Sequence, residues 1–202
     1  MFRSHRPASP LRSRRLALVI LCAASLMVIL DGTIVTVALS SIQADLGFTA
    51  AGLSWVMTGY LIAFGGLLLL SGRLGDLLGR KRMFLAGIAV FVAASLLCGL
   101  ATAPAMLIAA RFVQGAGAAM ASAVTLGMIV RLFDGPAEQG RAIGAYAFTG
   151  AVGASAGLIA GGLLVQYASW HWIFFVNLPV GLAAWLAAWR VLPADRGARS
   201  GL

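Results

Sequence analysis

Long apolar segments alternate with short polar segments along the whole chain. Each apolar segment is close to or above the roughly 20 residues that a helix needs to cross about 30 Å of hydrocarbon. Spanning strands would be only about ten residues long, with alternating polarity. The pattern therefore predicts an all-α integral membrane protein. Its six transmembrane helices are expected over Leu16–Leu39, Leu53–Leu70, Met83–Ala101, Ala105–Val130, Ile143–Val165 and Trp172–Leu192.

Basic residues occur in every second polar segment. They precede the first apolar segment, lie between the second and third and between the fourth and fifth, and follow the sixth. The other three connections contain no Lys or Arg. The positive-inside rule then predicts that both termini are cytoplasmic, in a multi-pass protein of the plasma membrane. This topology accounts for the net charge of +9, so we expect the lipid bilayer, and no nucleic acid, as the partner of the basic residues.

Composition agrees with a membrane protein. The chain is 61% hydrophobic and 10% charged, whereas a soluble domain has about 25% charged residues. We predict a basic cytoplasmic tail over residues 1–15, a six-helix bundle over residues 16–192 and a cytoplasmic tail or linker over residues 193–202. Ser40–Gly52 is the longest connection expected on the outer side. A signal peptide is disfavoured at the first apolar segment because the segment is too long and contains Asp31.

Two charged residues interrupt the apolar segments. Arg111 is the one charged residue between Ala103 and Val130, and Asp31 is the acidic residue in a comparable position of the first segment. A charge near the middle of a bilayer costs about 2.5–3.5 kcal/mol even on the lenient insertion scale. Such residues usually serve a pathway, a partner or a proton, although a structural ion pair is the alternative.

Small residues repeat at every fourth position in two apolar segments. Gly153, Gly157 and Gly161 form one such series, and Gly115 with Ala119 begins another. This spacing lets helix backbones approach closely in lipid. Tight packing alone explains the series, and a smooth surface on which helices slide is the alternative.

Other candidate chemistry is sparse. Cys22 and Cys98 lie in apolar segments without nearby histidines, so no metal site is expected. Trp170 and Trp172 flank an outer boundary and are expected in an aromatic belt. His171, between them, is expected at the same lipid interface.

A serine nucleophile is a competing hypothesis. Residues 153–157 read Gly-Ala-Ser-Ala-Gly, which is formally the Gly-x-Ser-x-Gly pattern of hydrolases. A nucleophile needs a base within hydrogen-bond reach. His171 is expected at the outer surface, whereas Ser155 is expected about 16 Å deeper, at about 1.5 Å per residue. An intramembrane protease is therefore a remote alternative.

The run GRLGDLLGRKR, residues 72–82, joins the second and third apolar segments. It lacks the lysine pattern and the preceding strand of a phosphate-binding loop. It resembles the signature of the major facilitator superfamily, Gly-x-Leu-x-Asp-x-x-Gly-Arg-Lys, although Leu77 stands where an arginine is usual. In that family the acid, here Asp76, docks against a helix N-terminus and an arginine of the second half. Arg80 is expected to pair instead with Asp134 or Glu138, because that second half lies outside this sequence.

Five further segments resemble motifs of drug:proton antiporters of the fourteen-helix subfamily. They are residues 30–39, 53–61, 110–119, 157–162 and 170–181. The sequence departs from these motifs at several positions. Thr36 replaces a customary asparagine, Ser40 and Leu158 each replace a customary proline, and His171 replaces a customary arginine. Leu158 puts in doubt the helix kink that is thought to limit leak in the family.

The resemblance implies a role for three sets of residues. The proton-coupling and cavity residues are Asp31, Arg111 and Gln114. The conformational-switch residues are Gly72, Gly75, Asp76, Gly79 and Arg80. The residues that shape the fifth helix are Gly153, Gly157, Gly161 and Gly162. Arg111 is expected to face the central cavity and to hold a neighbouring carboxylate ionised, because arginine itself does not deprotonate.

The resemblance also implies a fold and a function. Six helices would form a 3+3 inverted repeat, the N-terminal half of a secondary active transporter. The activity would be proton-coupled efflux of amphipathic drugs or other small molecules, driven by the proton gradient without a cofactor or an enzymatic step. The missing partner would be a C-terminal half of six or eight helices, in a longer chain or a separate polypeptide. Alternatives are a truncated or partner-dependent half without independent transport, and a transporter of a metabolite such as a sugar, amino acid or siderophore.

Overall fold

The computed structural model describes residues 11–193, with side chains described from residue 13. All regular structure in this part of the chain is helical. The elements are α1 (Leu11–Leu46), α2 (Ala50–Leu78), α3 (Arg80–Gly99), α4 (Pro104–Leu132), α5 (Pro136–Tyr167), α6 (Trp172–Phe175) and α7 (Asn177–Val191).

The seven elements form six spans that are long and apolar enough to cross a membrane. The short α6 and α7 together make the sixth span, Trp172–Val191. The prediction of an all-α protein with six spanning helices is confirmed. The division of the sixth span has a local cause. Pro179 has no N–H to donate to the carbonyl four residues earlier, at Phe175, and the break falls between the two, at Val176.

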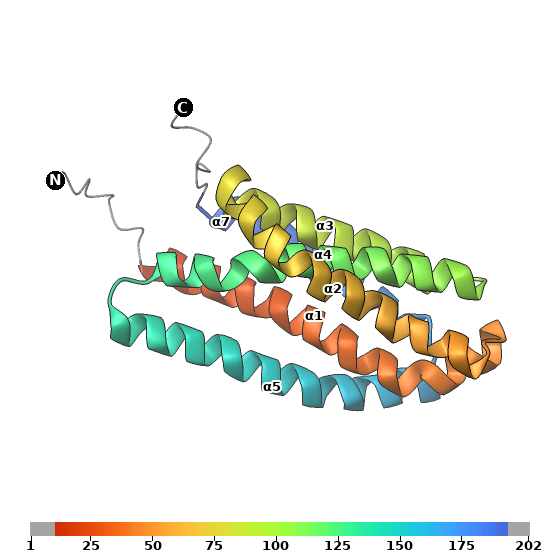
Figure 1. Ribbon diagram of the computed structural model, residues 1–202. Helices are drawn as coiled ribbons and strands as arrows, with labels where there is room; N and C mark the ends of the chain where they lie inside the picture. The colour runs from red at the N-terminus through yellow and green to blue at the C-terminus, as the bar shows by residue number, and fades with distance from the viewer. Residues whose placement is uncertain (1–10, 194–202) are drawn as a thin grey trace.

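The spans run up and down, and their packing is repeated (Figure 1). α1 begins and α7 ends at the same end of the bundle, where the α2–α3 and α4–α5 turns also lie. The most extensive contacts join α4 to α2 and α3, and α1 to α5 and α7. Exchanging the first three spans for the last three converts the α2–α4 pair into the α5–α1 pair. The packing therefore has the symmetry of a 3+3 inverted repeat.

Glycines allow the closest helix contacts. A side chain at Gly153, Gly157 or Gly161 of α5 would meet α1, and one at Gly117 of α4 would lie 2.5 Å from the backbone nitrogen of Phe91 in α3. These glycines do lie at helix–helix contacts, as their spacing of four residues indicates. Gly162 differs, because a Cβ there would have nothing within 4 Å. Helix sliding on this surface stays a prediction.

Three expectations about boundaries need correction. Residues 11–15 were expected in a tail, but they form the first turns of α1. Ser40–Gly52 was expected as a loop, but α1 continues to Leu46 and α2 begins at Ala50, so only a tight turn remains, with Gly47 at φ 68°. Apolarity marks the lipid-facing length of a helix and not its polar ends, which explains both errors. Trp170 was expected in the lipid interface, but it is 4% exposed.

Candidate functional site

A cluster of polar side chains lies inside the bundle. Arg111 is seven residues from the start of α4, about 10 Å into the helix at 1.5 Å per residue. α1 contributes Asp31, α4 also contributes Gln114, and α3 and α7 contribute Ser95 and Asn177. Each of the five side chains is at most 1% exposed. Four spans therefore converge on one enclosed polar site.

The centre of the site is an ion pair. Nη1 of Arg111 lies 2.6 Å from Oδ2 of Asp31, across 80 positions of sequence. The same nitrogen donates to Oε1 of Gln114 at 2.7 Å. The sequence identified both charged residues as exceptional, and the structure brings them together as direct partners.

The second oxygen of the carboxylate has two amide donors. Nε2 of Gln114 lies 2.9 Å from Oδ1 of Asp31, and Nδ2 of Asn177 lies 2.8 Å from the same oxygen. Both amides also donate to Oγ of Ser95, at 2.6 and 3.2 Å respectively. Asp31 thus accepts from three nitrogen donors on two other helices, which is the arrangement that suits an ionised carboxylate.

Aromatic rings and a backbone carbonyl enclose the guanidinium. Its Cζ lies 4.2 Å from the ring centre of Tyr60 and 5.9 Å from that of Phe174, within cation–π range. Nε donates to the carbonyl of Val56 at 3.3 Å. Nη2 finds no hydrogen-bond partner among the described residues. One donor group of the guanidinium, next to the ion pair, therefore makes no hydrogen bond to the described residues.

The position of Arg111 differs from one expectation. We expected its side chain to face the central cavity, but it is 0% exposed in this chain. The contacts of Arg111 explain the difference, because Asp31, Gln114 and the ring of Tyr60 surround its guanidinium. In this conformation the pair is an interior site of the bundle, and its role in coupling stays a prediction.

The turn between α2 and α3 holds a second ion pair. Nε and Nη2 of Arg80 donate to Oδ1 of Asp76 at 3.1 and 2.9 Å. Nη1 of Arg80 donates to the carbonyl of Gly127 in α4 at 2.6 Å. Gly79, with φ 100°, makes the turn between the helices, which explains why glycine suits this position.

The partners of Arg80 also differ from expectation. We expected Asp134 or Glu138, but Arg80 pairs within its own turn, and Asp134 instead pairs with Arg14 at 2.9 Å. Four-residue spacing across a tight turn favoured the local acid. Of the other switch glycines, Gly75 packs against Val124 of α4, whereas Gly72 borders open space.

The end of the bundle opposite the α2–α3 turn contains a smaller polar contact. Nε1 of Trp170 donates to Oδ2 of Asp45 at 2.9 Å, and the ring of Trp170 stacks on His171 with centroids 3.8 Å apart. These contacts join the end of α1 to the start of α6. Trp172, which is 54% exposed, remains available for a lipid interface.

The described residues offer little for other chemistry. No group of three or more His, Cys, Asp or Glu is close enough to hold a metal ion within residues 11–193. Oγ of Ser155 donates to the carbonyl of Ala151 in its own helix, an ordinary arrangement for a serine in a spanning helix.

Sequence reasoning missed Ser95 and Asn177. Each is a polar residue inside a predicted apolar segment, so the signal was present. A lone Ser or Asn in a membrane helix is common enough at helix contacts that it did not stand out. Only the packing of α7 against α1 and α3 shows that Asn177 reaches Asp31 and that Ser95 accepts from the amides of Asn177 and Gln114.

Comparisons with known proteins give the family. A model of the Major Facilitator Superfamily matches residues 21–202. The puromycin resistance protein of Streptomyces alboniger is 49% identical over 179 residues, covering 89% of this chain and 35% of that protein. The cephamycin export protein of Amycolatopsis lactamdurans is 44% identical over 180 residues, covering 89% and 37%. The tetracenomycin C resistance and export protein of Streptomyces glaucescens is 40% identical over 200 residues, covering 98% and 37%.

A solved structure has the same fold. A bacterial homologue of the human lysosomal transporter Spinster, inward-facing and unoccupied, matches with a TM-score of 0.71 at 18% identity, covering 94% of this chain and 46% of that one. The chain spans little more than a third of the length of the curated relatives it matches. The resemblance seen in the sequence is thus confirmed, and the chain belongs to the Major Facilitator Superfamily as a multi-pass membrane protein.

Proposed function

We propose that this chain is the N-terminal half of a proton-coupled exporter of amphipathic antibiotics. The observation that carries the proposal is the enclosed pair of Asp31 and Arg111, because a buried charge in a spanning helix is retained where function needs it. Relatives named for resistance to or export of puromycin, cephamycin and tetracenomycin C support the substrate class.

The hydrogen bonds of Asp31 suggest how proton binding is coupled to transport. All three groups that contact Asp31 are nitrogen donors. They use three of the roughly four acceptor positions of the carboxylate, and a proton that binds the carboxylate removes its negative charge and so weakens its hold on Arg111. Arg111, released from Asp31, would change its contacts with α2 and α1, and this change would accompany the reorientation of the two halves. Asp31 is thus the proposed proton acceptor, Arg111 its counter-ion and Gln114 the residue that holds both.

Transport is proposed to need the remainder of the relatives' length. The family carries substrate between two six-helix halves related by an axis along the membrane normal, and this sequence supplies one half. The mass of the native product in source membranes separates the alternatives. A product well above 20.9 kDa identifies one half of an ordinary transporter. A product at that mass favours a partner-dependent half, and requires a search for the second polypeptide.

The activity is tested in inside-out membrane vesicles that contain the whole gene product. A proton gradient is established, puromycin or tetracenomycin C is added, and release of the gradient and drug uptake are recorded together. We expect both signals for the wild type and neither for Asp31→Asn. Asp45→Asn is the matched control, because Asp45 is an acid of the same helix outside the buried site. Full proton-coupled uptake by Arg111→Lys would remove the proposed role of the guanidinium.

The alternative cargo is tested in the same vesicles. A sugar, an amino acid or a siderophore that releases the gradient, where the antibiotics do not, would identify a metabolite transporter. Drug uptake that needs no proton gradient would contradict the coupling mechanism while leaving the export function in place.

A further inference from the structure

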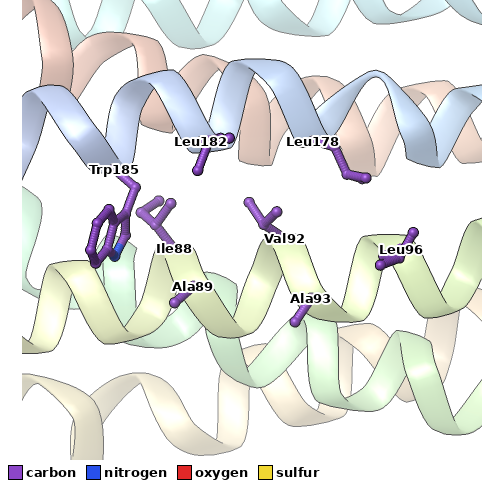
Figure 2. Close-up of a pocket in the computed structure, with 9 residues that line it drawn as sticks. Ile88, Ala89, Val92, Ala93, Leu96, Leu178, Leu182 and Trp185 are labelled. Carbon is purple, nitrogen blue, oxygen red and sulfur yellow. The ribbon is translucent and has the colours of Figure 1, made fainter.

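A groove on the outside of the bundle separates α3 from α7. Its volume is about 350 Å³, near the lower end for small-molecule sites. Figure 2 shows Ile88 and Val92 of α3 opposite Leu178 and Leu182 of α7, with Trp185 at one end. Every residue that lines it is apolar. The groove contains no polar group that could orient a polar substrate.

The floor of the groove depends on a close helix contact. A Cβ at Gly181 of α7 would collide with Val92 of α3. The indole nitrogen of Trp185 donates to the carbonyl of Leu85 at 3.0 Å, which closes the groove at the end nearest the α2–α3 turn. The groove therefore lies between two packed helices, with exposed lining residues such as Ala93 and Leu182.

Positive charge lies beyond this closed end. On α3, Arg82 is six residues before Ile88, about 9 Å along the helix, and it is exposed. On α7, Arg190 is five residues after Trp185, about 8 Å along the helix, and it is also exposed. Residues 77–100 and 172–193 contain no Asp or Glu.

A lysine joins the two helices between these arginines. Nζ of Lys81 donates to the carbonyls of Trp189 and Leu192 at 2.7 and 2.6 Å. Its ammonium group therefore lies where the start of α3 meets the end of α7. The apolar groove thus leads toward Lys81, Arg82 and Arg190, and the acid nearest to Lys81 in sequence, Asp76, is paired with Arg80.

We propose that this groove and its basic end bind one anionic phospholipid. An acyl chain occupies the groove, and the phosphate lies near Arg82 and Arg190. The predicted topology places the basic end in the cytoplasmic leaflet, where anionic lipids attract such side chains. The site lies on the outside of the bundle, and none of its lining residues takes part in the hydrogen bonds of Asp31 or Arg111.

The dimensions of the groove favour an acyl chain over a protein helix as its occupant. The groove extends from Ile88 to Leu96, about 12 Å at 1.5 Å per residue. A volume of about 350 Å³ over that length gives a mean cross-section of about 30 Å². A helix with side chains is about 10–12 Å in diameter, so its cross-section is several times larger. A single hydrocarbon chain enters where a helix would only lie across the opening.

The proposal is tested by counting lipids on the whole gene product in a mild detergent. Native mass spectrometry measures the binding of phosphatidylglycerol and of phosphatidylcholine at equal concentrations. We expect one tight phosphatidylglycerol and no comparable phosphatidylcholine. Arg82→Gln and Arg190→Gln should each weaken phosphatidylglycerol binding about fivefold, the equivalent of about 1 kcal/mol per basic residue. The matched control is Arg141→Gln, an exposed arginine of α5 at the same end of the bundle.

The groove itself is tested separately from the charge. Ala93→Phe fills the groove from an exposed position, and it should abolish the tight lipid while leaving Arg82 and Arg190 in place. Ala109→Phe, at an exposed position of α4, is its control. A phosphatidylglycerol with a photoreactive acyl chain should label peptides of α3 and α7. Equal binding of the two lipids, unchanged binding in Ala93→Phe, or labelling confined to other helices would each overturn the proposal.

Discussion

Asp31–Arg111 and Asp76–Arg80 are both carboxylate–guanidinium pairs, but they differ in burial, separation and partners. The first joins α1 to α4, and both side chains are fully buried. The second joins residues four apart, and the carboxyl side chain is 52% exposed. An exposed pair is worth about 0–1 kcal/mol because water competes with each partner. A buried pair pays for desolvation, so breaking it exposes a cost of about 3–5 kcal/mol.

The two pairs also differ in their hydrogen-bond partners, and the buried pair is again the more connected. Gln114 and Asn177 donate to the carboxylate of the buried pair, and Ser95 accepts from both amides, so the network draws on three helices. In the exposed pair, Arg80 also donates to the carbonyl of Gly127. The buried pair therefore fixes the relative placement of four spans, whereas the exposed pair ties one turn to one helix. Changes in the first should affect folding and coupling together, and changes in the second should affect coupling with little loss of stability.

The largest expected effect comes from Arg111→Ala. It leaves Asp31 buried without a cation, and we expect the free energy of unfolding to fall by about 3–5 kcal/mol. Unfolding in mixed detergent micelles with increasing dodecyl sulfate measures it. The double variant Asp31→Asn with Arg111→Met removes both charges and should recover most of this loss without recovering transport. A loss below 1 kcal/mol for Arg111→Ala would show that water already reaches the pair.

Asn177→Leu should have the next largest effect. It removes one donor from Oδ1 of Asp31 and one from Ser95, and the loss of a partner for a buried group costs about 1–3 kcal/mol. The same detergent titration measures the change. Val180→Leu, at an exposed position one turn later, is the control and should stay within about 0.5 kcal/mol. An equal effect of the two variants would mean that Asn177 stabilises the protein only by filling space and not through its hydrogen bonds.

The buried pair could be predicted in part from the sequence. Asp31 and Arg111 stand out because charges in apolar segments are rare, and the six spans follow from segment length. Their pairing could not be predicted, because it depends on the rotation of α1 and α4 about their own axes. Apolar residues occur on every face of both helices, so the periodicity of the sequence does not show which face points into the bundle. Ser95 and Asn177 did not stand out, because single Ser and Asn residues are common at helix contacts in membranes.

The contacts at the two ends of the bundle were harder to predict. The glycines and Asp76 of the α2–α3 turn stand out by resemblance, but the partner of Arg80 depends on side-chain reach at a surface where several acids compete. Trp170 was expected in lipid because aromatic residues gather at interfaces. Its indole nitrogen instead meets Asp45, a contact between residues 125 positions apart. Sequence patterns report the environment of a segment better than the partner of a side chain.

Gly127→Ala separates the third partner of Arg80 from the ion pair. A Cβ at this position would lie 2.6 Å from Nη1 and 2.9 Å from Cζ of Arg80, so the guanidinium must shift from its present position on the carbonyl of Gly127. Gly72→Ala is the matched control, because it meets nothing within 4 Å. Both variants gain about 1 kcal/mol of helix propensity. We expect Gly127→Ala to unfold more easily than Gly72→Ala by about 1.5–3 kcal/mol, a net loss of about 1 kcal/mol against wild type. Equal stability of the two variants would mean that Arg80 finds another acceptor.

Asp76→Asn should have the smallest effect on stability. The carboxylate is exposed, and Arg80 keeps the carbonyl of Gly127, so we expect the free energy of unfolding to change by no more than about 1 kcal/mol, and less at high salt. We expect proton-coupled transport to fall much further, because the proposed switch needs a negative charge at this turn. Unfolding and vesicle transport are measured on the same preparation, with Asp134→Asn as the control acid at the same end of the bundle. A parallel loss of stability and transport would make Asp76 a structural residue. Unchanged transport would leave the buried pair as the proposed coupling element and the exposed pair as a tie between α2 and α4.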